Sequence, residues 1–193
     1  THPVPVEILR KSKTLICTDG ATDGVLEAGL TPNLVIGDMD SLQTDPSNLS
    51  AEIVTLIGQD STDLEKALDW CIENGVPKVT LLGVTSGRED HALANLFIVA
   101  NYSSRLKVVI ISDHFTIHCA APGQWTFLVH RGQRVSLLPL EDSPLITTAG
   151  LQYALEEQPL EKGGRGISNR ASDEAFSLSI RGGTVLVFIE HLP

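Results

Sequence analysis

The first half of the chain alternates short apolar runs with stretches of helical periodicity. The clearest helix is predicted over residues 61–74, where apolar side chains recur three and four positions apart. Two more helices are predicted over residues 6–13 and 91–101. The strand-like runs cover residues 15–17, 34–36, 53–57, 79–82 and 106–111. Strands that alternate with helices predict a parallel sheet with helices on both faces.

The period changes after residue 112. Short β-rich runs follow one another, separated by Gly and Pro turns, and no convincing helix lies between them. These runs cover residues 115–119, 125–129, 135–138, 175–180 and 184–189. The pattern predicts an antiparallel sandwich or barrel. We therefore expect two domains, residues 1–118 and 119–193, with the change of structure between residues 112 and 123.

Composition excludes several classes of partner. A length of 193 residues, with 42% apolar and 20% charged residues, is ordinary for a soluble globular protein. The net charge of −10 argues against nucleic acid or an anionic membrane as partner. No apolar segment is long enough to cross a membrane, and from the opening residues we expect no signal segment. The three cysteines lack metal or disulfide spacing, which favours buried thiols and a cytoplasmic location.

Aspartates recur where the predicted strands of the first half end. They are Asp19, Asp38, Asp40, Asp60 and Asp90. In an open α/β sheet, ligands bind beyond the carboxyl ends of the strands. Carboxylates gathered there repel one another unless a cation joins them, and oxygen ligands suit Mg²⁺ that carries phosphates. The alternative is a solvated acidic face.

Residues 37–41, Gly-Asp-Met-Asp-Ser, form the sharpest local motif. In an extended backbone, Asp38 and Asp40 would project to the same side and could share one metal site. Gly37 would leave room for a phosphate. The alternative is a turn rich in Asp after a strand.

The segment before the helix of residues 61–74 has two interpretations. Asp60 is predicted as the N-cap and Asp63 as a residue of the first turn, which would be ordinary capping. The same helix N-terminus could also bind a phosphate. Lys66 could bind a phosphate or pair with Asp63, and we favour the pair.

Residues 83–91 connect a predicted strand to a helix and contain two glycines that let the loop approach a ligand. Arg88 has the planar donors that match phosphate oxygens, and Asp90 would add a carboxylate. The spacing is not that of a Walker A loop. His91 is interpreted as a structural residue of the helix start rather than a general base, and Asn95 as a residue that fixes the loop.

Together these motifs resemble the thiamin pyrophosphokinase family over residues 15–190. The resemblance rests on residues 19–21, 32, 37–41, 60–67, 87–91, 136–140, 147–151 and 168–169. It implies a Rossmann-like α/β domain that binds ATP and metal, followed by an antiparallel β-sandwich that binds thiamine and forms a homodimer. It also implies active sites shared between subunits.

The reaction implied by the resemblance moves the pyrophosphoryl group of ATP to the hydroxyl of thiamine, giving thiamine diphosphate and AMP, with Mg²⁺. The expected catalytic and metal-binding residues are Asp38, Asp40, Asp63 and Asp90. The expected ATP-binding residues are Asp19, Gly20, Gly37, Ser41, Asp60, Thr62, Gly87, Arg88 and His91. For thiamine we expect Ser168 and Asn169, in the glycine-rich loop of residues 163–169, whose alternative is an ordinary hairpin loop.

The chain departs from the family pattern at three points. Ala21 stands where a second glycine is usual, Ala92 follows His91, and a strand is expected to be missing before Val6.

Two other functions fit clustered aspartates or this fold. A D-x-D-x-[TV] motif would favour a Mg²⁺-dependent phosphohydrolase of a small phosphate ester, but residue 42, which follows Asp40 and Ser41, is Leu. A non-catalytic sensor of thiamine or nucleotide would need neither the carboxylates nor Arg88, and all of these residues are present here.

Overall fold

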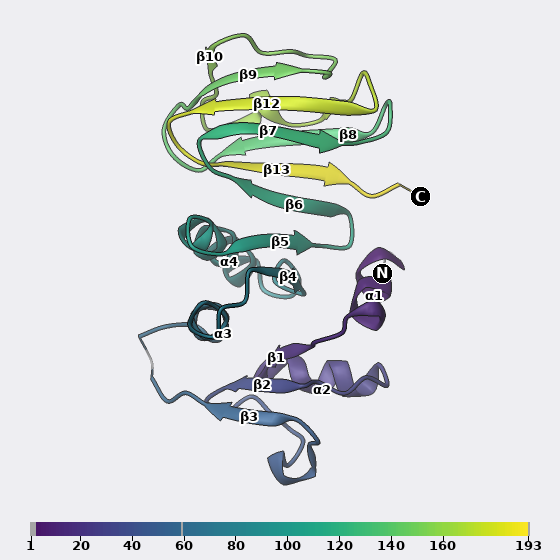
Figure 1. The fold of residues 1–193 in the computed structure, drawn as a ribbon, viewed down its shortest axis with the longest axis vertical. Coiled ribbons are helices and arrows are strands. Elements are labelled where there is room, and N and C mark those ends of the chain that lie inside the picture. Colours follow the sequence, from purple (N-terminus) through teal and green to yellow (C-terminus); the bar gives the residue numbers. More distant parts are fainter. Residues whose placement is uncertain (1–2, 59, 193) are drawn as a thin grey trace. The chain divides into compact units, whose positions relative to one another are not determined.

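The computed structural model describes residues 3–58 and 60–192, and the chain divides into two compact units between Pro77 and Lys78 (Figure 1). The elements of the first unit are α1 (Pro3–Lys11), β1 (Ile16–Thr18), α2 (Asp19–Glu27), β2 (Leu34–Gly37), the 3-10 helix η1 (Pro46–Asn48), β3 (Glu52–Thr55) and α3 (Asp63–Glu73). Strands β1, β2 and β3 form a parallel sheet in that order. The predicted parallel sheet is confirmed here, but only β1 and β2 are connected by an α-helix, because the segment between β2 and β3 contains just the short η1.

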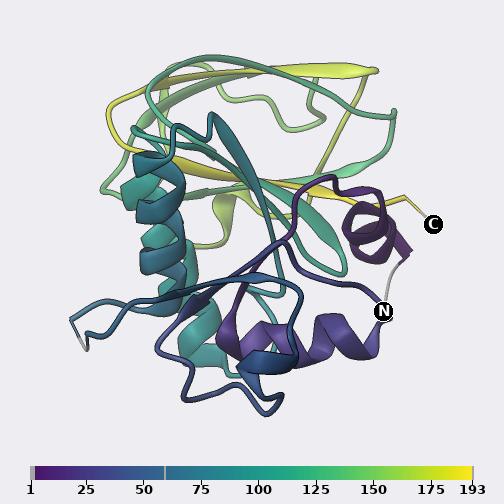
Figure 2. The same cartoon turned by 60° about the horizontal axis from the view of Figure 1, so that its bottom comes forward.

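Strand β2 is the centre of the first unit. All four of its residues are buried, and α2 and α3 both contact it (Figures 1 and 2). Helix α3 buries Leu64, Leu68 and Cys71, which follow the predicted apolar stripe. Helix α2 was not predicted. Its two glycines, at positions 20 and 24, weaken the helical signal because glycine has low helix propensity.

The start of α3 corrects one prediction. Asp60 is not its N-cap: Thr62 is, and its hydroxyl accepts a hydrogen bond from the N–H of Glu65. The Glu65 carboxylate in turn accepts one from the N–H of Thr62 (2.8 Å). This reciprocal arrangement is a capping box, and its Thr-x-x-Glu signature is legible in the sequence.

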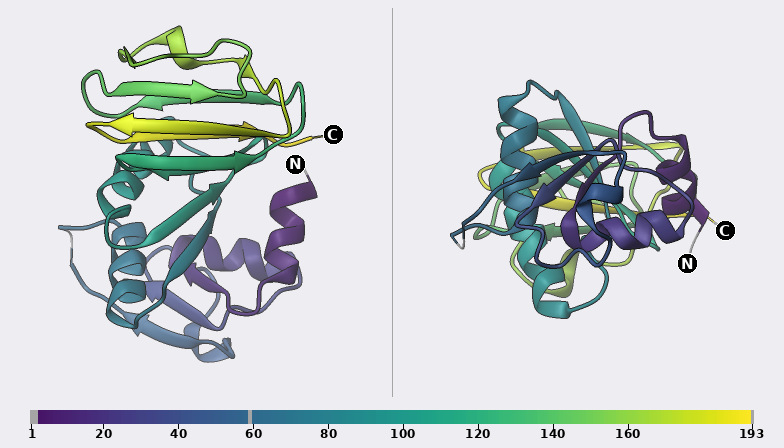
Figure 3. Two further views of the ribbon diagram at one scale, coloured as in Figure 1. Left: turned by 45° about the horizontal axis from the view of Figure 1, so that its top comes forward. Right: turned by 90° about the horizontal axis from the view of Figure 1, so that it is seen from below.

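The second unit contains two sheets. Its elements are β4 (Lys78–Leu82), α4 (Glu89–Tyr102), β5 (Lys107–Ile111), β6 (Phe115–Ala120), β7 (Gly123–Leu128), β8 (Arg134–Pro139), β9 (Leu145–Ala149), β10 (Gln158–Pro159), the 3-10 helix η2 (Gly164–Gly166), β11 (Asn169–Arg170), β12 (Ala175–Arg181) and β13 (Val185–Glu190). One sheet has the order β11-β8-β13-β6-β5-β4, and the other β10-β9-β12-β7. Figure 3 shows these strands from two further sides.

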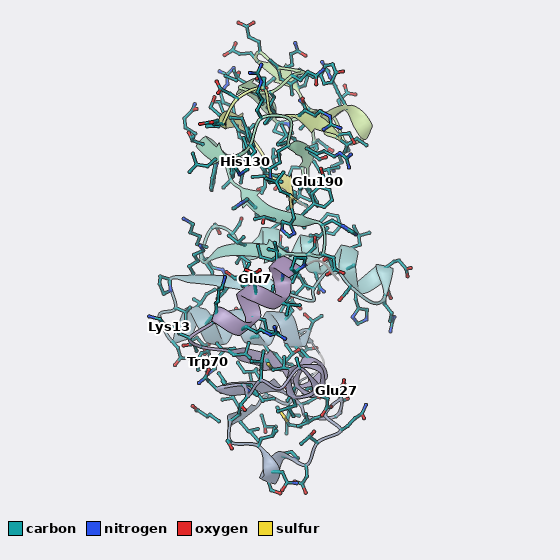
Figure 4. The ribbon with its side chains drawn as sticks, turned by 90° about the vertical axis from the view of Figure 1, so that its right-hand side faces the viewer. Glu7, Lys13, Glu27, Trp70, His130 and Glu190 are labelled. Carbon is teal, nitrogen blue, oxygen red and sulfur yellow. The ribbon has the colours of Figure 1, made fainter. Side chains whose placement is uncertain are left out.

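The larger sheet is mixed. Strands β4 and β5 are parallel, but β5 also pairs with the antiparallel β6. The five parallel strands of the first half therefore lie in two sheets rather than one. Strand β13 pairs with β6 and β8, and its last residue, Glu190 (labelled in Figure 4), forms an ion pair with Arg134 of β8 (2.9 Å).

A hydrophobic core fills the antiparallel part of the second unit. It includes Phe127, Leu137, Ile146, Phe176 and Leu178, which come from strands of both sheets. The predicted antiparallel β-structure after residue 112 is confirmed, while β9, β10 and β11 were not predicted.

The three cysteines are free, and Cys17 and Cys71 are buried as predicted, whereas Cys119 is half-buried. Burial raises the pKa of the Cys17 and Cys119 thiols to about 11. Within residues 3–58 and 60–192, no helix combines the length and the apolar character that crossing a membrane requires.

Candidate active site

Three aspartates of the first unit converge at the ends of neighbouring strands. Asp19 follows β1, and Asp38 and Asp40 follow β2, which pairs with β1 in parallel. Each of the three side chains offers a carboxylate oxygen, and these atoms all lie within 4.8 Å of one another. Three of the five aspartates that the sequence pattern placed at strand ends thus converge at the carboxyl ends of adjacent parallel strands.

Asp19 is the buried member of this cluster, with only 1% of its surface exposed. Its Oδ1 accepts a hydrogen bond from the Gly20 N–H (2.8 Å), while Oδ2 has no hydrogen-bond partner among the described residues. Burial raises the pKa of this carboxyl; the Gly20 N–H opposes the rise, and the charge of Asp63 adds to it. An ionised carboxylate in this position needs a cation, because an unpaired buried charge is costly.

Gly37 is the residue that lets Asp19 occupy this position. A Cβ built on Gly37 would lie 2.7 Å from Asp19 Cγ and 2.8 Å from its Oδ1. The space that we assigned to a phosphate is therefore taken by the Asp19 carboxyl. The absence of a side chain at residue 37 instead brings the ends of β1 and β2 close together.

The segment from Asp38 to Asp40 is a turn. Met39 has φ +68°, and the Asp40 N–H donates to Asp38 Oδ1 (3.2 Å). The extended backbone on which we based the same-side argument is therefore wrong: the carboxylates approach each other through a left-handed residue. The Asp40 N–H lowers the pKa of Asp38, and the charge of Lys66 lowers it further. The turn and the carboxylate pair, which we treated as alternatives, coexist.

Lys66 supplies a positive charge next to this cluster. Its side chain is 8% exposed, and Nζ lies 2.9 Å from Asp63 Oδ1, so the predicted pair is confirmed. Asp63 raises the pKa of Lys66, and the charges of Asp38 and Asp19 raise it further. Lys66 is therefore a buried cation that partly balances the aspartates. Because Asp63 binds Lys66 and is not among the three converging carboxylates, its metal-binding role stays a prediction.

Asp23 of α2 was missed by the sequence analysis. Its carboxylate accepts hydrogen bonds from the Gln43 N–H (2.8 Å), the Thr44 N–H (3.1 Å) and the Thr44 hydroxyl (2.6 Å). The Thr44 hydroxyl is the main reason why the pKa of Asp23 is lowered. Asp23 thus fixes the loop that follows Asp40. This contact joins segments that are distant in the sequence, so no local sequence pattern predicts it.

The second unit carries the predicted arginine loop. Arg88 Nε and Nη2 donate to the two oxygens of Asp90 (3.1 and 2.6 Å), and this pair is exposed. Arg88 lowers the pKa of Asp90 to about 2. Asn95 donates to the Val84 carbonyl (2.8 Å), so its predicted role in fixing the loop is confirmed. The roles of Arg88, Asp90, Gly87 and His91 toward ATP stay predictions.

The remaining predicted ATP residues lie in the first unit. The Ser41 hydroxyl donates to Asp40 Oδ1 (2.9 Å). A Cβ on Gly20 would lie at an ordinary 3.7 Å from Ser41 Cβ, so packing alone does not require this glycine. Asp60 is exposed, and the Thr62 hydroxyl is used in the N-cap of α3.

The predicted thiamine loop contains one strained and one buried residue. Ser168 has φ +59°, and its N–H donates to the Ser136 hydroxyl (2.9 Å). Asn169 is 8% exposed, and its carboxamide bonds the main chain of Tyr153. Gly166 packs so closely on the Leu137 carbonyl that no side chain would fit. The loop backbone is therefore held in place by its own unit.

Comparison with known proteins identifies the family. Residues 6–110 match the family described as "Thiamin pyrophosphokinase, catalytic domain". Residues 114–185 match "Thiamin pyrophosphokinase, vitamin B1 binding domain". The chain belongs to the thiamin pyrophosphokinase family. It is thus an enzyme of this family, and the phosphohydrolase and sensor alternatives find no support.

Similar proteins come from animals, fungi and bacteria. "Thiamin pyrophosphokinase 1" of Caenorhabditis elegans is 28% identical over 167 residues, which cover 79% of this chain and 69% of the relative. "Thiamine pyrophosphokinase" of Bacillus subtilis is 28% identical over 148 residues, covering 72% and 69%.

Solved structures share the fold. The thiamine pyrophosphokinase of Bacillus subtilis has a TM-score of 0.82 at 24% identity, covering 94% of this chain and 90% of that chain. Thiamin pyrophosphokinase from Candida albicans has a TM-score of 0.82 at 16% identity, covering 96% and 83%.

Proposed function

We propose that this protein transfers the pyrophosphoryl group of ATP to the hydroxyl of thiamine, giving thiamine diphosphate and AMP. The observation that carries this proposal is the ordered pair of family matches, catalytic and vitamin B1-binding, which together span residues 6–110 and 114–185. In the reaction, the thiamine oxygen bonds to the β-phosphorus, the bond from the α,β-bridging oxygen to that phosphorus breaks, and the hydroxyl proton is lost.

We further propose that the cation is Mg²⁺ and that Asp19, Asp38 and Asp40 hold it. The donor set supports this, since it consists of carboxylate oxygens within 4.8 Å of one another, and hard oxygen ligands suit Mg²⁺. The buried Oδ2 of Asp19, which has no partner among the described residues, points to the same conclusion. When bound, the ion would neutralise charge on the polyphosphate.

The chain's own residues would then orient the reactants. Phosphoryl transfer depends mostly on positioning and charge stabilisation, so fixed groups matter more than covalent chemistry. Lys66 limits the repulsion among the aspartates, and the Asp38–Asp40 turn sets the direction of their oxygens. Arg88 would exchange its exposed partner, Asp90, for a phosphate, which its planar donors match.

The other predicted roles complete the proposal. Asp63 and Asp90 would lie close to the metal or triphosphate, and Ser168 and Asn169 would belong to the thiamine site. Residues 1–118 would bind ATP and metal, and residues 119–193 would bind thiamine and form the homodimer, with active sites shared between subunits. No nucleic acid or membrane partner is proposed, and the protein would act in the cytoplasm.

An assay of AMP release tests the function. Purified protein is incubated with ATP and Mg²⁺, with and without thiamine, and AMP and orthophosphate are measured. We expect AMP only when thiamine is present, whereas a phosphohydrolase would release orthophosphate without an acceptor and a sensor would release nothing. Asp40→Asn is the matched inactive variant, since it is nearly isosteric but loses a charge. We expect it to lose more than about 100-fold in turnover.

A further inference from the structure

The three converging carboxylates come from two separate parts of the first unit. Asp19 is the first residue of helix α2, whereas Asp38 and Asp40 lie in the loop of residues 38–44, which follows β2. One oxygen of each carboxylate lies within 4.8 Å of those of the other two. The spacing of these oxygens therefore depends on how the loop is held against α2.

The loop of residues 38–44 has no regular structure that would hold it in place. It contains neither helix nor strand, and among the described residues no hydrogen bond between main-chain groups involves residues 39–44. Its internal bonds are local, since the Asp40 N–H donates to Asp38 Oδ1 (3.2 Å) and the Ser41 hydroxyl donates to Asp40 Oδ1 (2.9 Å). Such bonds shape a turn but do not fix its position relative to α2.

Asp23 is the residue that joins this loop to α2. Its Oδ2 accepts a hydrogen bond from the Gln43 N–H (2.8 Å). Its Oδ1 accepts from the N–H and from the hydroxyl of Thr44 (3.1 and 2.6 Å). Hydrogen bonds to an ionised acceptor are stronger than those between neutral groups. One side chain of α2 thus holds the end of the loop that lies farther from β2.

Asp19 and Asp23 lie on the same side of α2, because residues four positions apart on a helix are neighbours. Helix α2 is itself well anchored. It contacts β1 and β2 (Figure 1), and the buried Thr22 donates from its hydroxyl to the Thr18 carbonyl (2.9 Å). One anchored helix therefore carries Asp19 and also fixes the loop that carries the other two carboxylates.

We propose that Asp23 is a positioning residue of the metal site and that it favours Mg²⁺ over Ca²⁺. This inference rests on the proposed function, which assigns the ion to Asp19, Asp38 and Asp40. Mg²⁺ requires oxygens at about 2.0–2.1 Å in nearly octahedral geometry, whereas Ca²⁺ accepts about 2.3–2.6 Å and irregular arrangements. A loop bonded to α2 keeps the carboxylates close together, which suits the smaller ion. A loop released from α2 would let the site widen for the larger ion.

Asp23→Asn weakens the contact between loop and helix with little change in side-chain size. The carboxamide keeps one oxygen for Thr44, but its amino group would face the Gln43 N–H, and two donors cannot bond each other. The matched control is Asp45→Asn. The Asp45 carboxylate likewise accepts from an N–H and a hydroxyl, both of Ser47 (2.9 and 2.7 Å), but these bonds stay within one short segment.

Thermal unfolding of the full chain in increasing MgCl₂ or CaCl₂, without nucleotide or thiamine, gives the Kd of each ion. Each variant is compared with its own Tm in EDTA, so that a general loss of stability does not enter the Kd. We expect Asp23→Asn to raise the Kd for Mg²⁺ about tenfold or more and the Kd for Ca²⁺ less than about threefold. Asp45→Asn should leave both Kd values unchanged. Asp23→Asn overturns the proposal if its two Kd values stay unchanged or rise by the same factor.

Thr44→Val keeps the proposal falsifiable if Asp23→Asn does not fold. It removes the hydroxyl that donates to Asp23 and keeps the branched shape of the side chain. We expect a smaller change in the same direction, about threefold in the Kd for Mg²⁺, with the Kd for Ca²⁺ unchanged. Equal effects on the two ions, or no effect on either, would overturn the positioning role.

Turnover at saturating Mg²⁺ separates positioning from direct participation in the reaction. Because Asp23 acts through the loop, excess Mg²⁺ should restore kcat of Asp23→Asn to within about twofold of wild type, with the loss confined to the KM for Mg²⁺. Asp40→Asn should stay inactive under the same conditions. A kcat of Asp23→Asn that remains low at saturating Mg²⁺ would contradict a role in positioning alone.

Failure of this inference is distinguishable from failure of the proposed function. If the Tm of wild type does not respond to Mg²⁺ and no AMP forms, the proposed function is wrong. If wild type binds Mg²⁺ and forms AMP, and Asp23→Asn discriminates between the two ions like wild type, the function stands and only the role of Asp23 is wrong.

Discussion

Replacing Asp19 by Asn should stabilise the metal-free protein and weaken its stabilisation by Mg²⁺. Asp19 is 1% exposed, and its Oδ2 has no hydrogen-bond partner among the described residues. Burial is the main cause that raises the pKa of its carboxyl. The pKa of Asp19 is therefore higher in the folded state than in the unfolded state. The free energy of unfolding that protonated Asp19 contributes is fully present below the unfolded-state pKa, and it is lost as the pH rises through the folded-state pKa. At pH 7 the ionised carboxylate therefore destabilises the metal-free folded state.

The expected magnitude follows from this burial. A buried polar atom without a partner costs about 1–3 kcal/mol. Asn keeps an oxygen for the Gly20 N–H and directs a donor toward the neighbouring carboxylates. The metal-free variant should thus gain about 1–3 kcal/mol at pH 7, which at about 2–4 °C per kcal/mol is a rise in Tm of about 2–12 °C.

Mg²⁺ should stabilise wild type more than the Asp19→Asn variant. At a concentration of about 100 times its Kd, Mg²⁺ stabilises wild type by about 2.7 kcal/mol. The variant should gain much less, because it has lost a ligand charge. Thermal unfolding is measured with EDTA and with Mg²⁺, at pH 7 and at a series of lower pH values. The advantage of the variant in EDTA should shrink as the pH falls, since protonation of Asp19 removes the buried charge from wild type. Asp113→Asn, at an exposed aspartate, is the control and should change neither value.

Two outcomes would contradict the prediction for Asp19→Asn. One is a metal-free Asp19→Asn protein that is less stable than wild type at pH 7. The other is a rise in Tm with Mg²⁺ that is equal in wild type and variant.

Three further predictions concern the neighbouring residues and the assembly. Lys66→Met should lower the Tm of the metal-free protein, because it leaves Asp63 and its neighbours without their buried cation. Mg²⁺ should then raise the Tm of this variant more than that of wild type, and an unchanged Tm in EDTA would contradict the prediction. Arg88→Lys should raise the KM for ATP without changing Tm, since its pair with Asp90 is exposed; an unchanged KM would leave Arg88 a surface residue. At a low thiamine concentration, a mixture of Asp40→Asn and Asn169→Ala subunits should form more AMP than either impaired parent, and failure to do so would argue against shared active sites.

The sequence predicted the position of the acidic site because strand ends are legible from local patterns. Asp38 and Asp40 follow a run of apolar residues, and parallel neighbours bring Asp19 to the same edge. The helix of residues 19–27 was missed, since its glycines weaken the helical signal. The pairing of Lys66 with Asp63 was predicted correctly because residues three apart are neighbours on a helix.

What could not be predicted depends on contacts between distant segments. The space at Gly37 is filled by Asp19, which is 18 positions away, so a local argument assigned it to a phosphate instead. Asn169 looked like a ligand donor because its type suits an aminopyrimidine. Only the folded chain shows that its carboxamide is engaged by the Tyr153 main chain.

Phosphorus NMR of the reaction products can follow the transferred pyrophosphoryl group itself. The protein is incubated with ATP, Mg²⁺ and thiamine, and the fate of each phosphorus of ATP is followed. A pyrophosphoryl transferase gives AMP, which retains the α-phosphorus, and an equal amount of thiamine diphosphate, which carries the β- and γ-phosphorus together. We expect this one-to-one pair of products, and ADP with thiamine monophosphate, or ADP with orthophosphate, would contradict pyrophosphoryl transfer.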